Sequence, residues 1–91
     1  MSKRHYIIYD GRAMAETDDA TALEAGIGSL AEAKESAPDY GGAACWSYRE
    51  RGGQLTDERF EFYGFPEEDG SYTIITDHRK ALEEIERRIN S

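Results

Sequence analysis

The sequence predicts an α+β fold: an antiparallel-dominated sheet of four to five strands with two helices, in the order β-β-α-β-β-β-α. Strand-forming stretches flank Gly52-Gly53, a pair typical of a hairpin turn. Two stretches with helical spacing follow the capping residues Ser29 and Asp77. The 91 residues are the usual size of one domain, so we expect residues 1–91 to form a single domain.

The first strand is expected over residues 5–10, where both faces are apolar, as in a central strand covered on two sides. Residues 20–25 could form a helix, but their alternation favours a short strand returning beside the first. Gly26 is expected to end that strand. A capping box at Ser29 predicts a helix that ends near Ala37, because the proline that follows restricts the residue before it.

Residues 43–63 form the predicted hairpin. A two-residue turn would mix aromatic rings and charges on each face, whereas a three-residue loop over residues 52–54 separates them. We therefore predict the longer loop, which opposes Arg51 to Leu55. This register places Ala44, Trp46, Tyr48, Glu58, Phe60 and Phe62 on one face, and Cys45, Arg49 and Asp57 on the other, more polar face.

The last strand is predicted over residues 72–76, and Asp77 is expected to cap a helix that runs to about Asn90. Helical spacing places four residues on its inward face: His78, Leu82, Ile85 and Ile89. On the outer face, two ion pairs are expected at i,i+4 spacing: Glu83 with Arg87, and Glu84 with Arg88.

The acidic residues are the most informative feature for function. Nineteen Asp and Glu against eleven Lys and Arg give a net charge of −8. Residues 13–47 carry seven of these acids and a single base, Lys34. Such a field repels nucleic acid and anionic membranes and attracts basic protein surfaces. The candidate partner-binding residues are Glu16, Asp18, Asp19, Glu24, Glu32, Glu35 and Asp39.

The sequence carries no catalytic signature, and we expect a protein that is not an enzyme and uses no cofactor. Cys45, the single cysteine, could pair only with His5 or His78, and a small strand residue is the favoured interpretation. The acids at 18–19 and 67–69 lack the spacing of a calcium loop, so no metal is expected. The basic residues are dispersed, which argues against direct nucleic acid binding. We expect a cytoplasmic protein without a membrane segment.

The chain also resembles a class of small phage and mobile-element proteins, the anti-CRISPR proteins. The resemblance covers residues 6–63 and rests on Thr21-Ala22-Leu23-Glu24-Ala25, on Ser29-Leu30-Ala31-Glu32-Ala33-Lys34, and on a hairpin with Trp46, Tyr48 and Phe60. It implies a non-enzymatic, phage-encoded inhibitor. Such an inhibitor occupies a basic surface on which a host complex binds its target DNA or guide.

Two interpretations stay open at this stage. The first is an acidic binding protein, an inhibitor of the anti-CRISPR or anti-restriction type that meets a basic surface of a host protein complex. The second is a homodimeric structural or regulatory module that pairs through a sheet edge or outer aromatic residues, in which the acidic charge serves only solubility.

Overall fold

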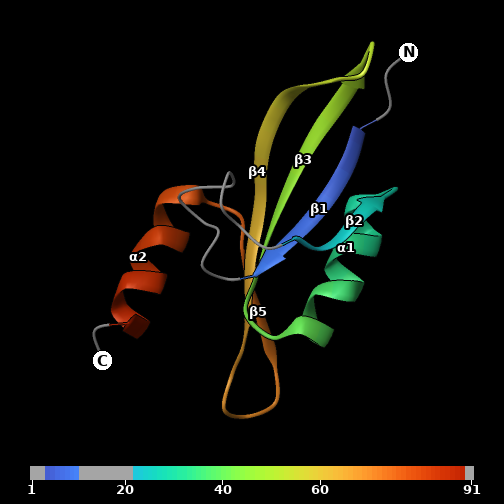
Figure 1. The fold of residues 1–91 in the computed structure, drawn as a ribbon. Coiled ribbons are helices and arrows are strands. Elements are labelled where there is room, and N and C mark those ends of the chain that lie inside the picture. Colours follow the sequence, from blue (N-terminus) through green and yellow to red (C-terminus); the bar gives the residue numbers. More distant parts are fainter. Residues whose placement is uncertain (1–3, 11–21, 90–91) are drawn as a thin grey trace.

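A computed structural model describes residues 4–10 and 22–89 (Figure 1). Among these residues, five strands form one sheet in the order β2-β1-β3-β4-β5, and every neighbouring pair is antiparallel. The predicted α+β fold class is confirmed. The elements are β1 (Arg4–Asp10), β2 (Ala22–Ile27), α1 (Leu30–Ser36), the 3₁₀ helix η1 (Ala37–Tyr40), β3 (Ala43–Arg51), β4 (Gln54–Pro66), β5 (Tyr72–Ile75) and α2 (His78–Ile89).

The two helices lie on opposite sides of the sheet, so each side has its own core (Figure 1). On the α1 side, Ile8 of β1 packs with buried residues of β2, α1, β3 and β4. On the α2 side, Ala81 packs with Tyr63 and Phe65 of β4. β3 contributes to both cores, with Cys45 on the α1 side and Ala44 on the α2 side. β1, for which two-sided cover was predicted, contributes to the core on the α1 side alone among the described residues.

β2 pairs with β1 as the sequence predicts, but Gly26 does not end the strand. Tyr6 pairs with Ile27 and Ile8 with Glu24, so two residues of β2 oppose one residue of β1. Gly26 lies in this bulge with φ 72°, a value that glycine adopts without a steric cost. The bulge accommodates the backbone conformation of Gly26, and the strand continues to Ile27.

The capping signal of α1 is confirmed. The Ser29 hydroxyl accepts a hydrogen bond from the backbone N–H of Glu32 at 3.2 Å. Ala33 and Ala37 are fully buried against the sheet. The α-helix ends at Ser36, and the chain tightens into η1, whose second residue is the proline. α1 is short, and burial of one face holds it in place.

The turn of the β3–β4 hairpin has two residues instead of the three predicted. Arg51 pairs with Gln54, and the two central glycines have φ values of 59° and 80°. Positive φ at both central residues is what a tight two-residue hairpin turn requires. The predicted register is wrong at the turn. A two-residue turn was not predicted, because it would mix aromatic rings and charges on each face. Two bulges in β4 change the pairing beyond the turn and so avoid this mixing.

The first bulge restores the predicted pairing in the middle of the hairpin. Asp57 and Glu58 together oppose Tyr48, and Asp57 has φ 53°. The extra residue shifts the ladder by one position. Trp46 therefore faces Phe60 as predicted, and their rings meet edge to face with centroids 5.6 Å apart.

The second bulge moves Phe62 to the opposite face. Trp46 pairs with Phe60 and Cys45 with Phe62, so Glu61 is the extra residue. Phe62 and Cys45 are both fully buried in the core on the α1 side. The predictions that Phe62 shares the face of Trp46 and that Cys45 lies on a polar face are therefore wrong. One added residue reverses the alternation of every side chain beyond it.

α2 begins as predicted, because the Asp77 carboxylate accepts a hydrogen bond from the N–H of Lys80 at 3.0 Å. Its buried face includes Ala81, Leu82 and Ile85. The expected pair of Glu84 with Arg88 is present at 2.9 Å. The expected pair of Glu83 with Arg87 is wrong. Instead, two pairs share these side chains: Arg79 with Glu83 at 3.7 Å, and Arg87 with Glu84.

Candidate functional site

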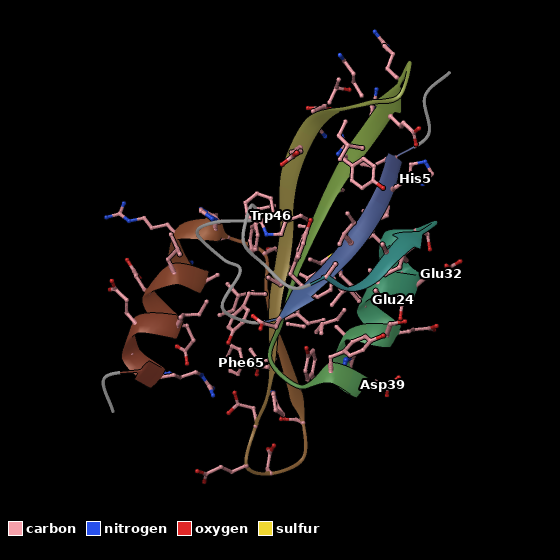
Figure 2. All side chains as sticks on the ribbon, in the orientation of Figure 1. His5, Glu24, Glu32, Asp39, Trp46 and Phe65 are labelled. Atoms are coloured by element: carbon pink, nitrogen blue, oxygen red, sulfur yellow. The ribbon has the colours of Figure 1, made fainter. Side chains whose placement is uncertain are left out.

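Four of the predicted partner-binding residues lie on one side of the molecule and are called here the acidic surface: Glu24, Glu32, Glu35 and Asp39. Glu24 lies on β2, the next two on α1, and Asp39 in η1. Figure 2 shows Glu24, Glu32 and Asp39 on the side formed by β2 and α1. The other three candidates, Glu16, Asp18 and Asp19, lie outside the described residues.

Helical spacing explains why three of these carboxylates point outward together. Glu32, Glu35 and Asp39 are separated by three and four residues, the spacing of one helix face. Ala33 and Ala37, which are fully buried, occupy the opposite face. All three acids are exposed, while Glu24 is half-buried. The four acids and Lys34 give this surface a net charge of −3.

Glu24 also ties β2 to η1. The Tyr40 hydroxyl donates a hydrogen bond to Oε1 of Glu24 at 2.8 Å. This bond to a carboxylate raises the pKa of the Tyr40 phenol above its ordinary value of 10.0, and burial adds to the shift. The contact fixes one carboxylate relative to α1 and η1, which carry the other three.

Charge compensation distinguishes the acidic surface from the rest of the described chain. Within residues 4–10 and 22–89, none of its four carboxylates forms an ion pair. Elsewhere, four acids are paired with arginines: Asp57, Glu67, Glu83 and Glu84. Six further exposed acids carry no ion pair among the described residues. They are dispersed over β3, β4, α2 and the loops before β5 and α2: Glu50, Glu58, Glu68, Asp69, Asp77 and Glu86.

A second charged group lies on the hairpin, around Asp57. Its carboxylate contacts Arg4, Arg59 at 3.0 Å and Arg49 at 4.0 Å. Desolvation raises the pKa of the Asp57 carboxyl, but the guanidinium groups of Arg59 and Arg4 together outweigh it and lower the pKa. Arg49 and Asp57 were predicted to share a face, whereas the contact with Arg4 was not predicted. The contact joins residues 53 positions apart, and no local signal marks it.

Arg4 also enters the interior through Ser47, a fully buried residue. The Arg4 guanidinium donates to the Ser47 hydroxyl at 2.7 Å, and that hydroxyl donates to Oε1 of Glu61 at 2.7 Å. The buried hydroxyl is thus satisfied on both sides. Its partners place Ser47, Asp57 and the surrounding arginines on the α1 side of the sheet, beyond the end of α1.

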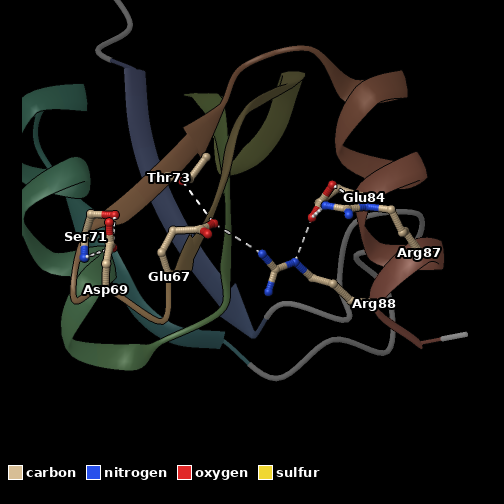
Figure 3. A network of polar contacts seen from close by, with 7 residues as sticks. All are labelled: Glu67, Asp69, Ser71, Thr73, Glu84, Arg87 and Arg88. Carbon is tan, nitrogen blue, oxygen red and sulfur yellow. Dashed lines mark hydrogen bonds and ion pairs between the residues drawn. The ribbon is translucent and has the colours of Figure 1, made fainter. Parts of the chain in front are cut away.

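A cavity of about 490 Å³ opens between the β4–β5 loop and the C-terminal end of α2. Figure 3 shows the polar network along its wall. Arg88 donates to Glu84 at 2.9 Å and to Glu67 at 3.3 Å, and its guanidinium lies 3.7 Å from the ring centre of Phe65. Hydrogen bonds from Arg87 and Arg88 lower the pKa of the Glu84 carboxyl. The charges lining this cavity largely neutralise one another.

The Cys–His combinations considered from the sequence are separated by the sheet. Cys45 is buried on the α1 side, and burial raises the pKa of its thiol to about 12, with a further contribution from Glu61. His78 packs against Trp46 and Phe60 on the α2 side, with ring centroids 5.7 and 5.0 Å away. His5 packs against Tyr48 on that same side. Neither imidazole can reach the thiol to act as its base.

Within the described part of the chain, no group of three or more His, Cys, Asp or Glu side chains has the arrangement of a metal site. Neither of the described helices combines the length and the apolar character needed to cross a bilayer. No family model, curated protein or solved structure matches the chain.

Proposed function

We propose that this chain is a small, non-enzymatic binding protein whose acidic surface docks on a basic, nucleic-acid-binding surface of a host protein complex. A phage-encoded inhibitor of the anti-CRISPR or anti-restriction type would act in this way. One observation carries the proposal. Three exposed carboxylates and one half-buried carboxylate gather on β2, α1 and η1, and within the described chain no arginine or lysine pairs with them.

The spacing of the charges supports imitation of a phosphate backbone. From Glu32 to Asp39 the helical axis advances ~12 Å, at ~1.5 Å per residue in α1 and ~2.0 Å in η1. Three carboxylates over this length lie ~6 Å apart, compared with ~3.4 Å of axis per phosphate on one DNA strand. The line of charge is thus about half as dense as a single strand, which is enough to attract a groove lined by Lys and Arg.

The helix that presents these carboxylates is held before any partner arrives. Ser29 caps its first turn, and Ala33 and Ala37 anchor its inner face. A preorganised surface loses less conformational entropy on binding than a flexible acidic tail. The acidic surface therefore suits docking better than the same charges on a mobile segment would.

The experiment measures DNA binding by purified CRISPR surveillance complexes and restriction enzymes while this chain is added. Fluorescence anisotropy of labelled target DNA reports displacement. We expect the chain to inhibit at least one complex in competition with DNA. The inhibition should weaken as salt rises from about 50 mM to about 300 mM, because screening shortens the reach of the charges. The proposal is contradicted if the chain competes with DNA for none of these complexes.

Two charge-matched variants test the surface itself. Glu32→Gln, Glu35→Gln and Asp39→Asn together remove three charges from the acidic surface. The control removes three charges from exposed acids elsewhere, with Glu50→Gln, Glu68→Gln and Glu86→Gln. Loss of inhibition only in the first variant supports the proposal. Equal loss in both would mean that overall charge matters and the location does not, as expected if acidity serves only solubility.

A further inference from the structure

The hairpin extends well beyond the helix that covers its base. α1 lies against β1 and β2, whereas the outer ends of β3 and β4 project past it (Figure 1). From residue 49 of β3 to residue 59 of β4, every residue is exposed. The α1 side of the sheet thus consists of a covered half, next to α1, and a bare half on the projecting hairpin.

The bare half on the α1 side carries four arginines, called here the basic surface: Arg4, Arg49, Arg51 and Arg59. The contacts of Arg4 with Ser47 and Asp57 place it on this face. Arg49 and Arg51 follow Ser47 at alternate positions of β3, so their side chains leave the same face. Asp57 and Glu61 lie on this face as well, which leaves a net charge of +2.

The arginines keep donors available beyond the ion pairs that they make. Arg49 and Arg59 are 47 % and 59 % exposed, and both share the single carboxylate of Asp57 with Arg4. A guanidinium has five N–H donors in a planar fork. A carboxylate arriving from outside can therefore bind the basic surface without displacing Asp57.

The acidic and basic surfaces lie next to each other on one side of the molecule. The carboxylates of α1 point away from their own sheet, because Ala33 and Ala37 hold the inner face of the helix. The basic surface lies at the level of the bare sheet, lower than the outer face of α1. The acidic surface is therefore a raised ridge, and the basic surface is a lower floor beside it; the two are called the ridge and the floor.

We infer that the basic surface docks a second copy of this chain, with α1 of each copy lying on the bare hairpin of the other. A two-fold axis between the ridge and the floor exchanges the two, so each acidic ridge meets a basic floor and the contact is made twice. The two α1 helices then lie side by side between two sheets. This inference does not rest on the proposed function. The dimer and a host complex would use the same carboxylates of α1, so the two contacts exclude each other and the chain docks on a host as a monomer.

Charge decides in favour of a second copy over nucleic acid as the occupant. A chain with a net charge of −8 repels a phosphate backbone at long range, and a net charge of +2 on one face does not reverse that field. The acidic surface, with a net charge of −3, offers the opposite charge on a rigid helix. In the two-fold arrangement, each net-negative surface lies against a net-positive one.

Sedimentation equilibrium and light scattering at about 20 mM salt test the inference, with a parallel series at about 500 mM, where charges are screened within a few ångström. One variant reverses the ridge, with Glu32→Lys and Glu35→Lys. The other reverses the floor, with Arg49→Glu and Arg51→Glu, which leaves the contacts of Asp57 with Arg4 and Arg59 intact. Circular dichroism and thermal melting confirm that each variant folds.

We expect the wild-type chain to dimerise at low salt and its dissociation constant to rise at least about tenfold at high salt. Each variant alone should be monomeric, because both of its surfaces then carry the same sign. An equimolar mixture of the two should restore the dimer, since each reversed ridge meets a reversed floor. A chain that carries all four substitutions should also dimerise.

Three results would overturn the inference. The first is a wild-type chain that stays monomeric at low salt up to millimolar concentration. The second is a dimer that neither variant weakens, which would place the contact elsewhere. The third is a monomeric wild-type chain that binds a labelled single-stranded oligonucleotide at low salt and loses that binding in the Arg49→Glu, Arg51→Glu variant. That result would assign the basic surface to nucleic acid.

Discussion

The hydroxyl of Tyr72 donates a hydrogen bond to the carbonyl oxygen of Gly41 at 2.8 Å, and this contact joins β5 to the end of η1. It crosses the α1 side of the sheet and passes over Gly64 of β4. The tyrosine ring occupies the space in which a side chain at position 64 would begin. The outermost strand on one edge is thereby tied to the segment that carries the acidic surface.

Replacing Gly64 by alanine should therefore destabilise the fold by about 1–3 kcal/mol, the usual cost of forcing an added methyl group into a packed site. A Cβ at position 64 would overlap the ring of Tyr72. Gly42→Ala is the matched control, because its nearest neighbour would be the Tyr63 hydroxyl at an ordinary 3.6 Å. Urea denaturation of both variants measures the difference, and equal free energies of unfolding would refute the packing.

Tyr72 should also make stability depend on alkaline pH. Burial, with Tyr63 nearby, raises the pKa of the Tyr72 phenol from 10.0 to about 12. Between these values the unfolded chain has released the proton and the folded chain has kept it. The stabilisation is therefore complete below pH 10 and is lost as the pH rises towards about 12.

Urea midpoints at pH 8 and at about pH 11 measure this effect in the wild-type chain and in Tyr72→Phe. The variant should lose about 0.5–1.5 kcal/mol at pH 8, because the hydrogen bond to Gly41 is gone. Its further loss on going to high pH should be smaller than that of the wild type. An identical alkaline loss in both chains would show that other groups account for it.

The Cys45 thiol should be inert in the folded protein. It is fully buried, and its pKa of about 12 leaves almost no thiolate at neutral pH. We expect alkylation by iodoacetamide at pH 8 only as fast as the chain unfolds, and full reaction in urea. Rapid stoichiometric labelling of the native chain would contradict the burial of this side chain.

Removal of the Ser47 hydroxyl, at the base of the hairpin, should lower the free energy of unfolding by about 1–3 kcal/mol. Ser47→Ala leaves a guanidinium N–H of Arg4 and a carboxylate oxygen of Glu61 without their partner at 2.7 Å. Thr56→Ala is the control, since it deletes a hydroxyl from an exposed position of the same hairpin. Thermal melts should separate the two variants, and the prediction fails if their midpoints agree.

The parts of the fold that were predictable from the sequence are those specified by neighbouring residues. The caps at Ser29 and Asp77 act over three residues, and both are present. The pairing of Trp46 with Phe60 was predicted correctly, but for an incomplete reason. The predicted three-residue loop and the observed bulge at Asp57 shift the ladder by the same one residue.

The failures come from extra residues and from long-range contacts. Glu61 bulges out of β4 and sends Phe62 to the α1 side, and no local pattern marks that insertion. Arg4 reaches Asp57 across the sheet, a contact that exists only after β1 has paired with β3. The candidate acids were chosen from the uneven charge of residues 13–47, and the four that the structure describes lie on β2, α1 and η1. Helical spacing separates Glu32 and Glu35 from the buried Ala33.

Chemical labelling of carboxylates is the measurement that tests the proposed docking surface most directly. A carbodiimide couples a small amine to exposed Asp and Glu side chains. Mass spectrometry then compares the free chain, diluted until it is monomeric, with the chain bound to an inhibited complex. We predict that labelling of Glu32, Glu35 and Asp39 falls sharply on binding, while three exposed acids elsewhere react as before: Glu50, Glu68 and Glu86. Unchanged labelling on α1 and η1, with protection at those other acids, would contradict the account.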